Sequence, residues 1–249
     1  MTMAELFSQY LEHLFVGRRA EARELLFSAQ DRGVAACKLL RGVIWPAMEQ
    51  IEKLYRENRI SRITEHMATR INRMMADQIQ AVLRREPKSG RRIVVVCGDG
   101  ETEELGAQIT ADLFEAKGWS VWFLGSGVPN DEILQFTGKI RPDLLCIYGS
   151  HPSGIPNIRR LVDLIREVNA CEQMQILTMG GVFNRAEGRA EEIRADLSAA
   201  TAEEAVATAI AHPVRVPQPD VPQPGRRRKR KRKGAPSARM RRSRSTANV

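Results

Sequence analysis

The sequence predicts an α/β protein: an N-terminal helical bundle, then a flavodoxin/Rossmann-like parallel sheet domain, then a disordered basic tail. Apolar residues recur every three or four positions up to about residue 86, which is typical of helices. From about residue 90, short β-branched runs alternate with helical patterns, which predicts a parallel sheet. Eight consecutive Lys and Arg residues begin at Arg226 and predict the tail, because like charges repel and stay solvated. We therefore divide the chain into residues 1–86, 90–212 and 213–249.

The N-terminal part is expected to form a bundle of four or five helices. Its apolar pattern starts at Leu6 and is interrupted at Gly17, at Gly33 and near Pro46. Ser61 can cap a further helix, because its hydroxyl can accept a hydrogen bond from a free backbone N–H of the first turn. The methionines of that last helix are interpreted as core residues rather than as metal ligands.

The second part is expected to contain four strands and a weak fifth one. The predicted strands cover residues 92–96, 120–124, 144–148 and 175–179, with the weak strand near Leu197. The predicted helices cover about 102–117, 130–137, 158–168 and 202–211. Strands that alternate with helices form a parallel sheet covered on both faces. From Pro213 the chain is rich in proline, which predicts an extended linker.

The charge is divided unevenly along the chain. The formal net charge is +9, from 39 Lys and Arg against 30 Asp and Glu, but 12 of the 39 lie after residue 225 and no acid does. The first 225 residues therefore hold 27 positive and 30 negative side chains, a net charge of −3. This distribution excludes a basic nucleic-acid-binding fold over the whole chain.

Several further classes are excluded by what the sequence lacks. The first 30 residues show no signal peptide, and no stretch approaches the ~18 uncharged apolar residues of a membrane helix. The four cysteines have no CxxC spacing, and we interpret them as buried thiols. No P-loop and no GxSxG elbow is present. We expect a soluble cytoplasmic protein.

Glycines follow each of the four main predicted strands. They lie in residues 98–106, 125–129, 149–154 and 180–181. Ligands of open parallel sheets bind at the carboxyl ends of the strands, where these turns lie. Four glycine-bearing turns there suggest a bulky ligand close to the backbone. A dinucleotide is a poor candidate, because Glu103 stands in place of the third glycine and Glu101 and Glu104 also crowd the helix N-terminus.

With these turns the chain resembles the cobalamin (vitamin B12)-binding module family, found in methionine synthase, corrinoid methyltransferase carriers and light-sensing cobalamin regulators. The family motif reads DxHxxG, then SxL, then GG. Residues 101–106 stand at the first element, residues 150–152 at the second and residues 180–181 at the third. The resemblance covers about residues 1–212. It implies that cobalamin contacts Glu101, Glu103, Gly106, Gly149, Ser150, His151, Gly180 and Gly181 of the sheet domain.

The helical part resembles the cap of the same family. The family aromatic, usually tryptophan, lies over the upper face of the cobalt and is followed ten residues later by Glu-His. Tyr55, Glu65 and His66 stand at these positions. The alternative interpretation is a helix pair in which Tyr55 is partly buried and the other two residues point outwards.

The cobalt-binding element departs from the family. The family histidine ligates cobalt from below, and the aspartate and the SxL serine orient it. Here Glu103 replaces the histidine and Glu101 the aspartate, so ligation through this motif is not available. Three alternatives remain: cobalamin with its own base retained or with no lower protein ligand, another metal ligand such as His151, or a fold that has lost its cofactor.

The tail is expected to bind nucleic acid or another polyanion without sequence specificity, or to act only as a solubilising extension. The residues concerned are Arg226, Arg227, Arg228, Lys229, Arg230, Lys231, Arg232 and Lys233.

Our first hypothesis is a cobalamin-binding sensor or regulatory protein, a transcription regulator for example, tethered by this tail. The alternatives are a corrinoid carrier subunit of a methyltransferase system and a cofactor-free scaffold. The protein is expected to bind rather than to catalyse; an enzymatic role would be corrinoid-dependent methyl transfer. A homo-oligomer or a regulatory protein partner is also expected.

Overall fold

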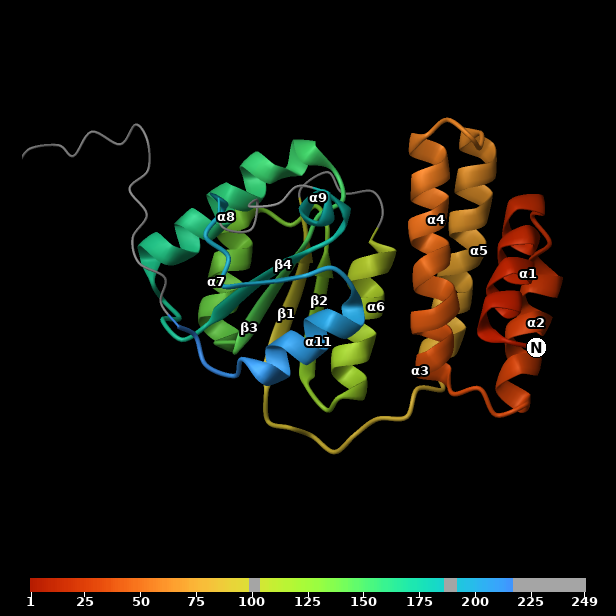
Figure 1. Ribbon diagram of the computed structural model, residues 1–249. Coiled ribbons are helices and arrows are strands. Elements are labelled where there is room, and N and C mark those ends of the chain that lie inside the picture. Colours follow the sequence, from red (N-terminus) through yellow and green to blue (C-terminus); the bar gives the residue numbers. More distant parts are fainter. Residues whose placement is uncertain (99–103, 186–191, 217–249) are drawn as a thin grey trace, which may run out of the picture. The chain divides into compact units, whose positions relative to one another are not determined.

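The N-terminal helices lie side by side in a computed structural model that describes residues 1–98, 104–185 and 192–216 (Figure 1). They are α1 (Met3–Val16), α2 (Arg19–Asp31), α3 (Ala36–Leu39), the π-helical turn η1 (Leu40–Ile44), α4 (Trp45–Arg56) and α5 (Arg62–Gln80). Gly17 ends α1 in the left-handed conformation, with φ of 78°. Ser61 caps α5 as predicted, because its Oγ accepts a hydrogen bond from the N–H of Thr64 at 3.1 Å.

The region of Pro46 differs from the prediction. Instead of an interruption, α3, η1 and α4 form one continuous helical segment from Ala36 to Arg56. Pro46 lacks a backbone N–H and lies in the first turn of α4, two residues after the end of the π-helical turn. The buried side chain of Asn72 donates to the Ile44 carbonyl at 3.0 Å and accepts from the Tyr10 hydroxyl at 3.0 Å, which joins three helices.

The sheet is fully parallel. It contains β1 (Arg92–Cys97), β2 (Ser120–Gly125), β3 (Leu144–Tyr148), β4 (Gln175–Met179) and β5 (Leu197–Ala199), in the order β2-β1-β3-β4-β5. Its helices are α6 (Leu105–Ala116), α7 (Asn130–Ile140), the short η2 (Pro152–Gly154), α8 (Ile155–Val168), α9 (Gly181–Asn184) and α11 (Ala202–Ala211). The predicted fold class is confirmed. Helix α8 begins earlier than predicted, because Pro156 fits its first turn.

Each face of the sheet packs against different helices (Figure 1). Ile93 and Val95 of β1 belong to a buried cluster that continues through α6 and α11 into the helical bundle. Val94 and Val96 point to the other face and pack in a second cluster with α7 and α8. The strict alternation along β1 thus produces two cores from one strand. The first core is shared by bundle and sheet, and Met1–Gln218 form one compact unit.

The chain after α11 is held against the sheet. Although the predicted linker begins at Pro213, the Pro213 carbonyl accepts from Arg91 at 2.7 Å and the Val214 carbonyl accepts from Gln175 at 3.3 Å. Arg215 Nε donates to Asp196 Oδ1 at 3.0 Å. Residues 213–216, which we call the strap, therefore follow the edge of the sheet at which the strands begin.

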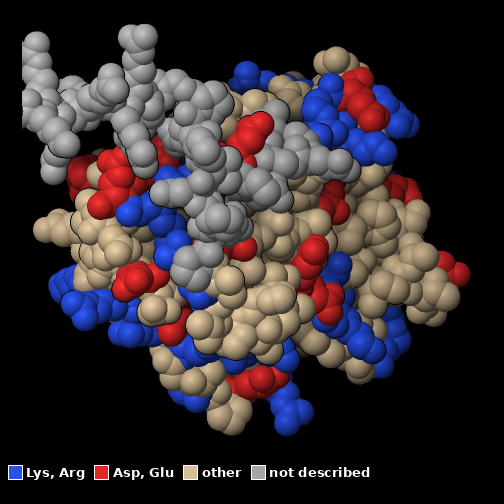
Figure 2. Space-filling view, turned by 60° about the vertical axis from the view of Figure 1, so that its left-hand side comes forward, with Lys and Arg blue, Asp and Glu red and all other residues tan. Residues whose placement is uncertain are grey.

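Charges of both signs are interspersed on the face shown in Figure 2. This mixed surface agrees with the net charge of −3 of the first 225 residues, whereas the strongly basic run lies outside the described residues. No helix among the described residues is long and apolar enough to cross a membrane. No disulfide joins the four cysteines, all of which the structure describes, and Cys97 and Cys146 are buried in strands as expected, whereas Cys37 and Cys171 are only partly buried.

Candidate functional site

The carboxyl ends of β1, β3 and β4 form the edge at which the sequence predicts a ligand. The strand order reverses between β1 and β3, whose following helices, α6 and α8, cover opposite faces. Such a switch point is where open α/β sheets bind ligands. The backbone N–H of Gly98 donates to the Tyr148 carbonyl at 2.7 Å, and that of Gly149 donates to the Met179 carbonyl at 2.9 Å. These bonds hold the three strand ends in register.

Gly149 and Gly180 bring the loops after β3 and β4 into direct contact. Gly180 has φ of 104°, and a Cβ atom on it would lie 2.4 Å from the Gly149 carbonyl oxygen. No other residue fits there without moving one of the loops. The close approach leaves a rim of backbone and small residues, which we define as residues 149–151 and 180–181.

Ser150 and His151 occupy different environments on this rim. Ser150 is buried, with 5% of its surface exposed, and its carbonyl accepts a hydrogen bond from Arg185. His151 is exposed and precedes the short η2. Within the described ranges, no three His, Cys, Asp or Glu side chains gather as a metal site would require. His151 as a cobalt ligand therefore stays a prediction.

The first motif element is described only from Glu104 onward. Glu101 and Glu103 lie outside the described residues. Gly106 lies in the first turn of α6, and a Cβ atom there would be 2.5 Å from the hydroxyl of Tyr148, so glycine permits this packing. Glu104 Oε1 accepts a hydrogen bond from the N–H of Ser126 at 2.5 Å, which ties the start of α6 to the loop after β2.

The three predicted cap residues lie on α4 and α5. Tyr55 is 40% exposed and lies in the last turn of α4. The Glu65 side chain is mostly buried and accepts from the Thr69 hydroxyl at 3.3 Å, while its Oε2 lies 3.6 Å from Nε2 of the exposed His66. Of these residues, the structure leaves Tyr55 and His66 accessible and turns Glu65 toward its own helix.

Arg185 joins the cap to the rim. One terminal nitrogen, Nη1, donates to Glu52 Oε1 of α4 at 2.7 Å, and the other, Nη2, donates to the Ser150 carbonyl. Sequence reasoning missed Arg185, Glu52 and the Glu104 contact with Ser126. Arg185 is separated from Glu52 by 133 positions, so no local pattern signals the pair.

The fold and the rim together define a class of protein: a helical cap attached to a parallel-sheet domain with glycine-rich loops at its carboxyl edge. Residues 91–210 match the family model described as the B12 binding domain, and residues 6–80 match a second model with the same description. The chain belongs to this B12-binding family. Cobalamin is the cofactor that membership of the family implies.

Two curated relatives are corrinoid proteins of Methanosarcina acetivorans. Dimethylamine corrinoid protein 2 is 25% identical over 193 residues, which cover 72% of this chain and 88% of that protein. Dimethylamine corrinoid protein 1 is 25% identical over 123 residues, or 49% of this chain. This match spans only 57% of that relative's length.

One solved structure shares the fold over most of the chain. It is the monomethylamine corrinoid protein of Methanosarcina barkeri, which aligns with a TM-score of 0.77 at 18% identity. The alignment covers 84% of this chain and 99% of the other. The similarity therefore includes both the helical cap and the sheet domain.

Proposed function

We propose that this chain binds a corrinoid at the rim and carries it for a partner methyltransferase. The observation that carries the proposal is the joined architecture: a cap helix with an accessible aromatic, Tyr55, contacts the glycine rim through Glu52 and Arg185. The named relatives are corrinoid proteins, which supports the carrier role over our first hypothesis of a sensor.

The residues of the rim fit a corrinoid with a nucleotide tail. Gly149, Gly180 and Gly181 offer backbone without side chains, and the buried Ser150 adds a polar group. Tyr55 would cover the upper face of the ring. When bound, the cobalt of the corrinoid supplies the centre at which a methyl group is exchanged; the chain binds and orients the ring and limits the access of water.

The lower side of the ring is proposed to differ from that of the family. Because Glu101 and Glu103 replace the aspartate and histidine, we propose a cobalamin that keeps its own base or has no lower protein ligand. Ligation by His151 is the alternative, since His151 belongs to the rim and is exposed.

A sensor or regulatory protein is the second candidate. Two features of the sequence favour it: Glu103, which removes the family's cobalt ligand, and the basic run from Arg226 to Lys233. We propose that the run binds nucleic acid or another polyanion through phosphate contacts, with an affinity that falls steeply with salt. The proposal requires that a chain without residues 226–249 loses salt-sensitive retention on DNA.

Retention of three cobalamins tests the carrier role against the sensor role. The purified chain is incubated in the dark with hydroxo-, methyl- or adenosylcobalamin, desalted, and examined by visible spectroscopy and size-exclusion chromatography before and after illumination. A carrier keeps hydroxo- and methylcobalamin, and its elution volume does not respond to light.

A light sensor would instead prefer adenosylcobalamin and change its elution volume on illumination. Colourless protein in all three cases would contradict both roles and leave the cofactor-free scaffold. A base-on spectrum of the retained cobalamin would support the absence of histidine ligation. If the single substitution His151→Ala changes the spectrum of the bound cobalamin, His151 is identified as the ligand.

A further inference from the structure

Arg185 bonds to two elements that are distant in the sequence. Its guanidinium donates from Nη1 to Glu52 on the cap helix α4, at 2.7 Å, and from Nη2 to the carbonyl of Ser150 after β3. Arg185 itself directly follows α9, which begins at Gly181, and its N–H donates to the Gly181 carbonyl at 3.2 Å. One side chain therefore connects the cap, the loop after β3 and the turn after β4.

Gly181 makes room for this connection. A Cβ atom at position 181 would lie 2.5 Å from Arg185 Nη1 and 3.2 Å from Glu52 Oε1. Any larger residue there would push the ion pair away from the rim. The second glycine of the GG pair thus accommodates a contact within the protein, in addition to any role toward a ligand.

The connection also restrains the aromatic residue of the cap. Tyr55 follows Glu52 by three positions in α4, so both side chains lie on the same side of the helix. A restraint on Glu52 therefore acts on the part of α4 that carries Tyr55.

We propose that Arg185 is a positioning residue of the corrinoid site: it holds α4 against the rim and so sets where Tyr55 lies over the bound ring. The inference rests on the proposed function for the identity of the ligand. The Arg185 and Glu52 side chains are 35% and 41% exposed, so water and salt weaken the pair, and the restraint is of moderate strength.

Hydrogen exchange of the corrinoid-free chain tests the connection itself. In Arg185→Gln and in Glu52→Gln, the amides in the last turn of α4 should exchange roughly three- to tenfold faster than in the wild type. The double variant should exchange no faster than the faster single variant, because both changes break the same contact.

Arg56→Gln is the matched control. Arg56 Nη1 contacts the same Glu52 oxygen at 3.2 Å, but from within α4, so its loss removes only an exposed i,i+4 pair and should speed exchange by less than about twofold. Equal exchange in Arg185→Gln and wild type, or effects of the two single variants that simply add, would overturn the connection.

Release of hydroxocobalamin after dilution tests the role at the site. Arg185→Gln and Glu52→Gln should release it roughly three- to tenfold faster than wild type, with a smaller difference at high salt, and Arg56→Gln should not. Faster exchange with unchanged release would show that Arg185 holds the cap without positioning the site, which refutes the proposal. A wild-type chain that takes up no corrinoid would refute both the proposed function and the site role of Arg185. The exchange measurement would still report on the connection by itself.

Discussion

Asp112 of α6 is a carboxylate in an unfavourable position. Its Oδ2 is buried and, among the described residues, has no hydrogen-bond partner. Burial, together with the nearby carboxylates of Glu115 and Asp77, raises its pKa from 3.8 to about 7, against a smaller opposing effect of Arg85. The folded chain therefore keeps this proton to a higher pH than the unfolded chain. The free energy of unfolding falls as the pH rises between these two pKa values.

Asp112→Asn should remove this pH dependence. We expect the free energy of unfolding to rise by roughly 1–2 kcal/mol near about pH 8 and to change much less near about pH 4, where the carboxyl is protonated in the folded chain and about half protonated in the unfolded chain. Urea unfolding at the two pH values measures the difference. A variant that is less stable than wild type at the higher pH would contradict this assignment.

At the residue scale, sequence reasoning found glycines but missed the polar contacts around them. Gly149 and Gly180 were predictable because they follow strands, where a tight turn or a close ligand favours glycine. Arg185 and Glu104 were not, because their partners are Glu52 and Ser126, which only the folded chain brings near. The burial of Asp112 could not be predicted from the sequence either, since it depends on how α6 packs.

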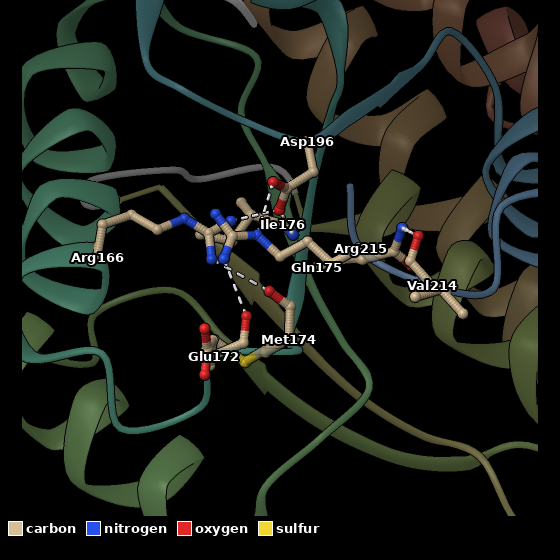
Figure 3. A network of polar contacts seen from close by, with 8 residues as sticks. All are labelled: Arg166, Glu172, Met174, Gln175, Ile176, Asp196, Val214 and Arg215. Carbon is tan, nitrogen blue, oxygen red and sulfur yellow. Dashed lines mark hydrogen bonds and ion pairs between the residues drawn. The ribbon is translucent and has the colours of Figure 1, made fainter. Parts of the chain in front are cut away.

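The strap is the element whose role the sequence least suggested. Figure 3 shows Arg166 and Arg215 converging on Asp196, whose side chain is 6% exposed. Asp196 Oδ2 also accepts from the N–H of Ile176 at 2.7 Å, and Arg215 Nη1 donates to the Glu172 carbonyl at 2.9 Å. Because the buried carboxylate and both arginines have partners, the strap is a stabilising part of the sheet domain.

Two truncations separate the strap from the basic run. A chain that ends at Gly225 keeps the strap, so its free energy of unfolding should match that of the full chain while its salt-sensitive retention on duplex DNA is lost. A chain that ends at His212 also loses the Arg215 contacts and should be less stable by about 1–3 kcal/mol.

Unfolding in urea and chromatography on immobilised DNA at two salt concentrations measure both effects. If the chain that ends at Gly225 is retained on DNA as strongly as the full chain, the proposed role of the tail is refuted. Equal stability of the two truncated chains would refute the role of the strap.

Elements with a strong pattern were predicted well. The run of Val94, Val95 and Val96 reads as a buried strand in any context, and β1 contains it. Helix ends were less certain, because Pro156 is compatible both with a loop and with the first turn of α8. The π-turn before Pro46 depends on packing against α5 through Asn72, which local periodicity does not reveal.

At the scale of the whole molecule, two groups of charges lie on different parts of the chain. The first 225 residues carry −3 and contain the rim, whereas the last 24 residues carry +12. The described chain ends at Val216, just after Arg215 is fixed by Asp196 near the start of β4. The rim lies at the opposite, carboxyl edge of the sheet. The strap and the rim therefore lie at opposite edges of the sheet.

The most direct test of a corrinoid site at the rim is the amount of hydroxocobalamin bound per chain after gel filtration, compared in wild type, Gly181→Val and Gly138→Val. A valine at 181 would fill the rim and displace Arg185, whereas a Cβ atom at 138, in α7, meets nothing within 4 Å. We predict about one cobalamin per chain in wild type and Gly138→Val and almost none in Gly181→Val, with all three chains folded by circular dichroism. Absence of cobalamin from the wild type, or full binding by Gly181→Val, would contradict the account.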